Sequence, residues 1–104
     1  NDFMRPALYD ATHNILPIVK NNKKVKGVIE FVGPICETTC KFVKYKKYQK
    51  VNQLDYVAIM DVGAYGSSLS SNYNTKPLIA ELLVDRARVK IIRKKQNLQN
   101  LINY

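Results

Sequence analysis

The chain has 104 residues, 46% of them hydrophobic, and a formal net charge of +9 at pH 7. This length supports a single hydrophobic core, and the apolar content argues against intrinsic disorder. There is no charged-then-apolar leader and no apolar run near the roughly 20 residues that span a bilayer, so we expect a cytoplasmic protein that binds no membrane. Because the first residue is not Met, we expect the chain to be part of something longer.

Residues 3–19 are rich in apolar side chains, but Pro6 and Pro17 exclude a long regular helix. We expect two extended pieces joined by a loop. Residues 21–24 have the composition of a polar turn, and they lead to Val28–Val32, whose β-branched and aromatic residues predict a strand. The order of these segments favours antiparallel neighbours.

Residues 41–53 are basic and interleaved with Tyr45 and Tyr48. They precede residues 55–62, which form a mostly continuous apolar run. Apolar side chains at successive positions are typical of a strand with both faces covered. We therefore expect this strand at the centre of a sheet.

Two glycines enclose a short segment directly after that run, at residues 63–66. Glycine lets a ligand approach the main chain closely, and the side chains of Ser67 and Ser68 are suited to cap a short helical turn. We expect the main chain of this segment to lie close to a phosphate or carboxylate of a ligand. Glycines at this spacing are also typical of a simple turn.

Residues 79–84 and 88–92 predict two further strands, and the short connection at residues 85–87 predicts a hairpin. Apolar residues recur at helical spacing in residues 96–104, which predicts a short terminal helix. Together, the segments predict five or six strands, and they lack the alternation of strands and helices that is typical of a parallel sheet. The sequence therefore predicts one mainly β domain over residues 1–104, a β-barrel or β-sandwich with short helical turns.

The pair Cys36–Glu37 follows the Gly33–Pro34 corner that ends the strand at Val28–Val32. Thiols and carboxylates are among the side chains that transfer protons near neutral pH, and residues just beyond a strand end commonly serve in sites. The alternative is a small buried Cys and a solvated Glu. Cys36 and Cys40 do not make a disulfide framework, and with His13 as the only histidine we expect no metal site.

Three separated motifs, taken in order, give the chain a family resemblance. They are MRPALYDATH at residues 4–13, GPICE at residues 33–37, and DVGAYGSS at residues 61–68 running into SNYN at residues 71–74, with AELLVD at residues 80–85. Their order and spacing resemble the carboxy-terminal domain of the diaminopimelate decarboxylases, pyridoxal-phosphate enzymes of lysine biosynthesis with the fold-type III, alanine racemase-like architecture. The resemblance covers nearly the whole chain and implies decarboxylation of meso-diaminopimelate to L-lysine.

The resemblance implies a role for five residues. Arg5 and Tyr9 become ligands of the substrate's distal carboxylate, which a guanidinium can hold with two parallel hydrogen bonds. Cys36 becomes the proton donor after carbon dioxide leaves, since free thiols are largely protonated at neutral pH. Glu37 pairs with the distal ammonium, and Tyr65 lies against the cofactor with its hydroxyl near the phosphate or the substrate. Without the motifs, Arg5 reads as a surface charge, Tyr9 as a core aromatic and Tyr65 as a residue packed at a turn.

The same resemblance implies what the chain lacks. In the family, an amino-terminal (β/α)8 barrel carries the cofactor lysine and most contacts to pyridoxal 5'-phosphate, and active sites form between two subunits. We therefore expect a partner barrel or intact subunit, a homodimer in the intact enzyme, a small-molecule substrate, and no turnover by the chain alone.

Two departures from the family pattern bear on fine positioning. Thr38 and Thr39 are followed by Cys40, a second thiol where a carboxylate is common, and residues 76–79 read KPLI in place of a more usual RPRP. Neither departure removes a residue with an implied role.

Two other functions stay open at this point. A basic β-barrel module could follow a nucleic-acid backbone with residues 44–50 and 86–95 while its tyrosines stack on bases. A genome rich in A and T would give the same surplus of Lys, Asn, Ile and Tyr without such a partner, and we do not expect nucleic-acid binding. The second alternative is an inactive remnant of the decarboxylase.

Overall fold

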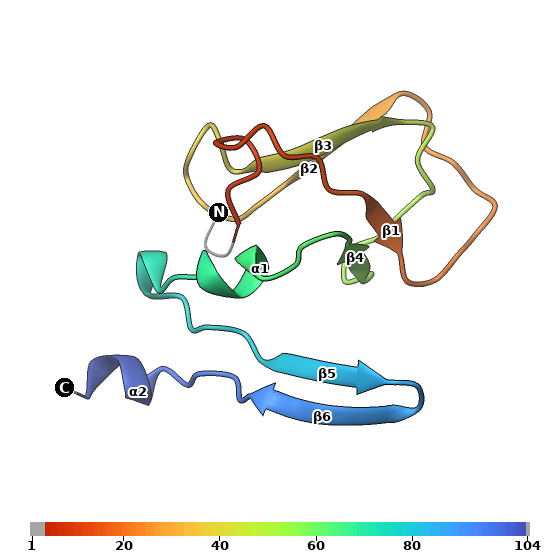
Figure 1. The fold of residues 1–104 in the computed structure, drawn as a ribbon. Helices are drawn as coiled ribbons and strands as arrows, with labels where there is room; N and C mark the ends of the chain where they lie inside the picture. The colour runs from red at the N-terminus through yellow and green to blue at the C-terminus, as the bar shows by residue number, and fades with distance from the viewer. Residues whose placement is uncertain (1–3, 104) are drawn as a thin grey trace. The chain divides into compact units, whose positions relative to one another are not determined.

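A computed structural model of the chain describes residues 4–103. Its strands are β1 (Ile15–Pro17), β2 (Val28–Val32), β3 (Lys41–Lys46), β4 (Val57–Ile59), β5 (Glu81–Asp85) and β6 (Arg88–Arg93), and its helical segments are α1 (Tyr65–Ser68), the 3-10 turn η1 (Tyr73–Thr75) and α2 (Gln99–Ile102) (Figure 1). The elements divide between two compact units, residues 5–63 and residues 64–103 with Met4. None of the helices in the described part of the chain is long and apolar enough to cross a membrane.

The first unit contains the antiparallel pair β1–β4, in which Ile15 lies opposite Ile59. A main-chain hydrogen bond joins the Met60 N–H to the Asn14 carbonyl at 2.7 Å. Because bonded and non-bonded pairs alternate along an antiparallel ladder, Ile15 directs its own N–H and C=O away from β4. Ile15 is only 1% exposed, so these two groups need partners within the protein.

Two tyrosines supply those partners from β3 and the residues after it. The Tyr45 hydroxyl accepts the Ile15 N–H at 2.8 Å, and the Tyr48 hydroxyl donates to the Ile15 carbonyl at 2.8 Å. The rings of Tyr48 and Phe31 meet edge to face, with centroids 5.1 Å apart. Burial raises the pKa of Tyr48 above its ordinary value, and the neighbouring Tyr45 raises it further. Side chains, rather than a continuous sheet, therefore connect β1 to the β2–β3 pair.

β2 and β3 form the second antiparallel pair of this unit, with Ile29 opposite Tyr45. The strand predicted at Val28–Val32 is confirmed with the same bounds. β3 has no counterpart among the predicted strands, because its lysines mark the segment as basic. Exposed Lys44 and Lys46 nevertheless flank the half-buried Tyr45, which is the alternation of a strand with one covered face.

The amino-terminal segment differs from the extended piece expected there. The Leu8 N–H bonds to the Arg5 carbonyl at 3.2 Å, and the Ala11 N–H bonds to the Pro6 carbonyl at 2.9 Å. Proline fixes a φ that suits a turn, and Asp10 has a left-handed φ of 50° that Asp tolerates better than most residues. This segment is therefore a compact turn, and only β1 of the two expected pieces is a strand.

The expected central strand is also wrong. Residues 55–62 contain the short strand β4 at Val57–Ile59, and within residues 4–103 its one strand partner is β1, so the strand lies in a two-stranded sheet and not at a centre. The extended conformation ends by Asp61, which adopts a left-handed φ of 57°. The polar turn at residues 21–24 does not join paired strands either, because β1 pairs with β4 and β2 with β3.

The second unit contains the hairpin β5–β6, in which Asp85 lies opposite Arg88. The predicted hairpin is confirmed, although β5 begins later and β6 ends later than expected. Gln96 continues the pairing past β6: its N–H bonds to the Leu78 carbonyl at 3.0 Å, and its side-chain Oε1 accepts the Leu78 N–H at 3.0 Å. The short terminal helix is confirmed as α2.

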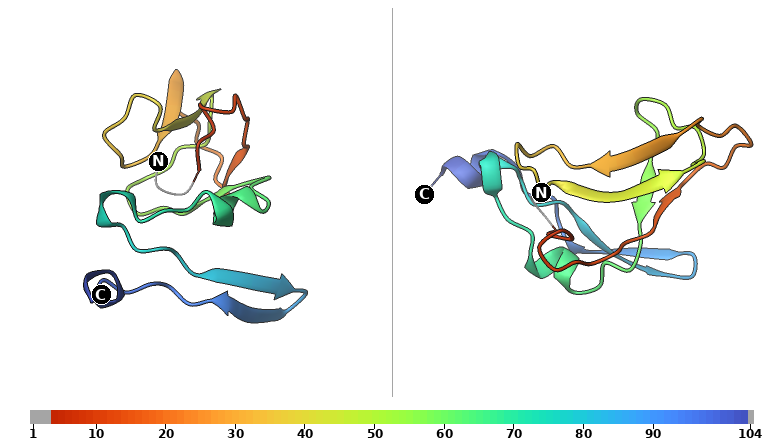
Figure 2. Two further views of the ribbon diagram at one scale, coloured as in Figure 1. Left: turned by 60° about the vertical axis from the view of Figure 1, so that its left-hand side comes forward. Right: turned by 90° about the horizontal axis from the view of Figure 1, so that it is seen from above.

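The prediction of a mainly β fold with short helical turns is confirmed for the described residues. The strands form three separate two-stranded antiparallel sheets, so no closed barrel is present among residues 4–103 (Figure 2). Within the first unit, the two hydrogen bonds from Ile15 to the hydroxyls of Tyr45 and Tyr48 connect the β1–β4 sheet to the β2–β3 sheet.

Candidate functional site

Cys36 lies in the middle of the loop that connects β2 to β3. The Glu37 N–H bonds to the Ile35 carbonyl at 2.8 Å, which makes Cys36 the central residue of a γ-turn. Its φ is not positive, so the turn is of the common inverse type. The thiol is exposed and free, and it makes no hydrogen bond to any of residues 4–103. The turn therefore presents an unengaged thiol to the outside.

Cys40 closes the same loop from its other end. It is 4% exposed and not in a disulfide. Its N–H bonds to the Glu37 carbonyl at 3.1 Å, its carbonyl accepts the Gly33 N–H at 2.9 Å, and its sulfur accepts the Ile35 N–H at 3.4 Å. This residue stands out in the sequence only as a departure from the family pattern, yet it ties both halves of the loop together.

Glu37 is a half-buried residue next to Cys36 in the chain. The Thr39 hydroxyl donates a hydrogen bond to its Oε2 at 3.4 Å. Within the part of the chain that the structure describes, the carboxylate has no cationic partner, since the ion pair found there joins Lys44 to Glu30. Glu37 is therefore oriented by a neighbour while its charge stays available to an external cation.

Arg5 and Tyr9 lie on the amino-terminal turn. Arg5 is exposed and Tyr9 is 63% exposed, and neither side chain bonds to another described residue. A shallow hollow is lined by Pro6 and its neighbours in this turn and by β3 from Lys41 to Lys44. The turn that contains Arg5 and Tyr9 therefore lines this hollow together with the first residues of β3.

Tyr65 is the first residue of α1, in the second unit. It is 71% exposed, and its hydroxyl makes no hydrogen bond to residues 4–103. Gly63, two residues earlier, has a φ of 57°, and a Cβ there would meet nothing within 4 Å. The turn is therefore open, and its phenol is free to lie against a ring or phosphate from outside the chain. A phenol in this position would fit against one part of pyridoxal phosphate.

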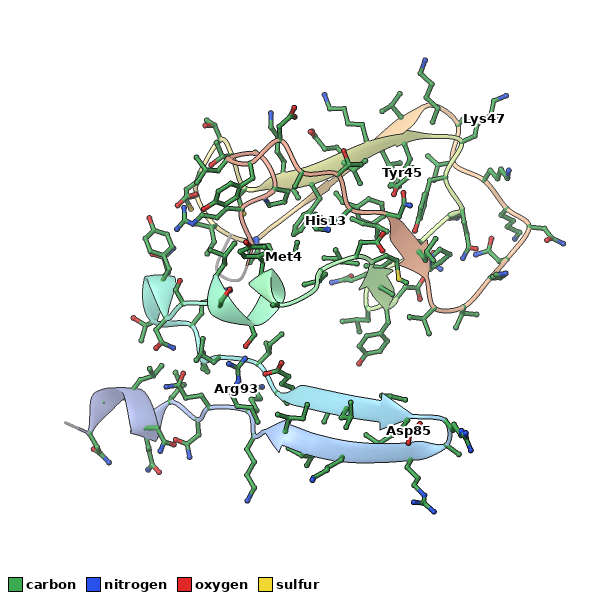
Figure 3. All side chains as sticks on the ribbon, in the orientation of Figure 1. Met4, His13, Tyr45, Lys47, Asp85 and Arg93 are labelled. Carbon is green, nitrogen blue, oxygen red and sulfur yellow. The ribbon has the colours of Figure 1, made fainter. Side chains whose placement is uncertain are left out.

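The expected serine caps of this turn are wrong. α1 has Ala64 at its N-cap without a side-chain cap hydrogen bond, and Ser67 and Ser68 lie inside the helix. The Ser67 hydroxyl donates to Glu81 Oε2 at 3.3 Å and accepts from Arg93 Nη1 at 3.2 Å. Arg93, labelled in Figure 3, is the last residue of β6. Because Glu81 and Arg93 are cross-strand partners, Ser67 joins α1 to both strands of the hairpin.

His13 and Tyr48 have structural roles. His13 Nδ1 lies 3.0 Å from the Met60 carbonyl oxygen. Because a carbonyl oxygen only accepts, Nδ1 carries the hydrogen and donates this hydrogen bond, which extends the β1–β4 pairing. In the part of the chain that the structure describes, no three His, Cys, Asp or Glu side chains are grouped to hold a metal ion. Tyr48 is 8% exposed with its hydroxyl engaged, so the base-stacking role considered for it is wrong.

The first unit thus contains four of the five residues with an implied role, and the second unit contains Tyr65. Cys36 and Glu37 share one turn, and Arg5 and Tyr9 share another. Their side chains are a thiol, a carboxylate, a guanidinium and a phenol, none of them paired with a charge among the described residues. The first unit therefore presents these four polar groups on two separate turns.

Comparisons with known proteins agree on one family. The family described as "Pyridoxal-dependent decarboxylase, C-terminal sheet domain" matches residues 1–63, which include Arg5, Tyr9, Cys36 and Glu37. The diaminopimelate decarboxylase of Aquifex aeolicus is 42% identical over 102 residues, and that of Haemophilus influenzae is 42% identical over 101 residues. These alignments cover 98% and 97% of this chain but 24% of each relative.

A solved structure supports the same family. The diaminopimelate decarboxylase of M. jannaschii in complex with L-lysine superposes with a TM-score of 0.83 and 36% sequence identity. The superposition covers 98% of this chain and 23% of that one. The chain therefore spans about a quarter of the length of the relatives it matches.

Proposed function

Because the chain belongs to the pyridoxal-dependent decarboxylases, as their C-terminal sheet domain, we propose that it is the carboxy-terminal part of a diaminopimelate decarboxylase. The proposed reaction converts meso-diaminopimelate to L-lysine and carbon dioxide. The observation that carries the proposal is the free, exposed Cys36 thiol in a γ-turn beside the uncompensated Glu37 carboxylate.

Cys36 acts as the proton donor. When bound, pyridoxal phosphate supplies an electron sink for the pair left on the α carbon by the departure of carbon dioxide. Cys36 Sγ gives its proton to that carbon, so that an S–H bond breaks as a C–H bond forms. A positioned general acid of this kind contributes on the order of 10²–10⁴ in rate. The exposed sulfur then recovers a proton from water.

Glu37 and Arg5 select the substrate by its far end. The distal end of diaminopimelate carries an ammonium and a carboxylate. Glu37, oriented by Thr39, pairs with the ammonium, while Arg5 grips the carboxylate through two parallel hydrogen bonds and Tyr9 adds a phenolic donor. A substrate without a distal carboxylate leaves the Arg5 charge without its partner.

Tyr65 holds one side of the cofactor, and other parts of the subunit hold the rest. We place the cofactor lysine and the main phosphate contacts in a barrel outside this chain, since the relatives are about four times longer. The β5–β6 hairpin supports such a partner, because its apolar side chains are more than half exposed at Leu82, Val84, Val89 and Ile91. Exposed apolar surface of this kind marks a place where another surface docks. A homodimer completes the proposed enzyme.

The test is to join this chain to the preceding part of the Aquifex aeolicus relative and to measure lysine and carbon dioxide formed from diaminopimelate. Cys36→Ala should lower turnover about 100-fold or more while the absorbance of the bound cofactor stays unchanged. Thr38→Ala is the matched control, because Thr38 is exposed in the same loop and its side chain has no hydrogen bond to the described residues.

The outcomes separate the parts of the proposal. If Cys36→Ala and Thr38→Ala have the same turnover, Cys36 is not the proton donor. If the joined enzyme acts on ornithine or arginine in preference to diaminopimelate, the roles of Glu37 and Arg5 are wrong. If the joined protein binds the cofactor and releases no carbon dioxide from any of these substrates, the chain is an inactive remnant.

A further inference from the structure

We propose that Cys40 is a positioning residue that holds the Cys36 thiol in place through the hydrogen bond between its sulfur and the Ile35 N–H. The consequence for catalysis rests on the proposed function, whereas the consequence for the loop does not. Cys40 departs from the family pattern, and in this proposal it stabilises the loop that contains Cys36.

The first step of the argument is the number of bonds at Cys40. It uses its N–H, its carbonyl and its sulfur, which reach Glu37, Gly33 and Ile35 respectively. The first two bonds depend only on the main chain and would persist with any residue other than proline at this position. The bond from Ile35 is the one that depends on the side chain of Cys40.

The second step is the position of Ile35, the residue directly before Cys36. Ile35 is 7% exposed, its N–H is bonded to the Cys40 sulfur, and its carbonyl accepts the Glu37 N–H. Both main-chain polar groups of this buried residue are therefore bonded within the loop. Since Cys36 is the central residue of the turn between Ile35 and Glu37, the direction of its side chain follows from how Ile35 is held.

The third step is what happens without the sulfur. Cys40→Ala leaves the buried Ile35 N–H without an acceptor, which is an unfavourable state for a main-chain donor. The loop relieves it by opening toward water, and the γ-turn at Cys36 opens with it. Cys40→Asn restores an acceptor without adding a charge near the thiol, so it should keep the turn.

The first measurement is amide hydrogen exchange by NMR on the full chain. In Cys40→Ala, exchange of the Ile35 amide should become about tenfold faster, while the Met60 amide in the β1–β4 pairing keeps its rate. In Cys40→Asn, the Ile35 rate should return to within about twofold of the parent chain. An unchanged Ile35 rate in Cys40→Ala overturns the proposal. Equal acceleration at Ile35 and Met60 overturns it too, since that indicates destabilisation of the whole unit.

The second measurement is the mobility of a spin label on Cys36. Cys40→Ala and Cys40→Asn are a matched pair, because Cys36 is the only thiol in each. The label should be more mobile in Cys40→Ala than in Cys40→Asn. Equal mobility in the two variants overturns the proposal, because the acceptor then has no effect on Cys36.

The third measurement uses the joined enzyme described above. Cys40→Ala should lower kcat about tenfold with KM within about twofold, because a displaced donor affects the proton transfer and not substrate binding. Cys40→Asn should recover most of kcat. Parent-like kcat in Cys40→Ala overturns the catalytic part. If no variant has turnover while exchange and mobility change as expected, the proposed function fails and the role of Cys40 in the loop stands.

Discussion

Replacing Tyr48 by Phe removes one hydroxyl from the centre of the first unit. That hydroxyl donates to the Ile15 carbonyl at 2.8 Å, and Ile15 is 1% exposed. Because Ile15 points its carbonyl away from β4, no neighbouring strand can take over the bond. The ring and its contact with Phe31 at 5.1 Å between centroids remain. The variant therefore tests the loss of a single buried hydrogen bond.

The expected cost is roughly 1–3 kcal/mol, because a buried acceptor is left without its partner. For a unit of this size, each kcal/mol corresponds to about 4–8 °C in melting temperature. Urea and thermal unfolding followed by circular dichroism would measure both quantities. Tyr48→Phe should shift the midpoints without changing the slope of the urea transition, since the surface exposed on unfolding is the same.

Tyr56→Phe is the control for this prediction. Tyr56 is 81% exposed, and its hydroxyl makes no hydrogen bond within residues 4–103, so its removal should change the free energy of unfolding by less than about 0.5 kcal/mol. If Tyr48→Phe is no more destabilising than Tyr56→Phe, the account of how Ile15 is held is refuted.

Two further predictions concern titration and the second unit. Because the folded-state pKa of Tyr48 lies above the ordinary 10.0, its stabilisation is complete below about pH 10 and is lost as the pH rises through the folded pKa; the urea midpoint of the parent chain should fall more steeply above that pH than the midpoint of Tyr48→Phe. Ser67→Ala should destabilise the β5–β6 hairpin by about 1–2 kcal/mol, since the variant removes both the donor to Glu81 and the acceptor for Arg93. Amide exchange in the hairpin measures this loss, with exposed Ser68→Ala as the control; equal exchange in the two serine variants contradicts the role of Ser67.

Elements with local signals could be predicted from the sequence. β2 has β-branched and aromatic residues followed by a Gly-Pro corner, and the β5–β6 hairpin has two such strands with a short connection. Composition does not predict β3, because lysines dominate residues 41–46, although their alternation with Tyr45 contains the strand signal. Residues 55–62 contain enough apolar side chains for a longer strand, but pairing stops before the left-handed Asp61, which composition does not reveal.

The candidate site was predictable only as a set of residues. The family resemblance implies roles for Arg5, Tyr9, Cys36, Glu37 and Tyr65, and the relatives confirm that resemblance. The shape of the site depends on bonds that spacing does not encode. The turn at the amino terminus and the γ-turn at Cys36 are closed by main-chain contacts within each segment and, in the second case, by a sulfur acceptor.

The anchoring of Ile15 by two phenols also affects how the first unit tolerates changes in chain length. A strand paired along a ladder can slip by one residue into an alternative register that inverts its side chains. β1 cannot slip in this way relative to β3, because Tyr45 and Tyr48 grip the two main-chain groups of one residue, 30 and 33 positions away in the chain. The loop between Pro17 and Val28 is held on the same side, because the Val25 N–H bonds to the Tyr48 carbonyl at 2.8 Å and the Lys50 N–H bonds to the Lys23 carbonyl at 2.8 Å. An insertion that displaced residues 23–25 would therefore act directly on the segment that contains Tyr48.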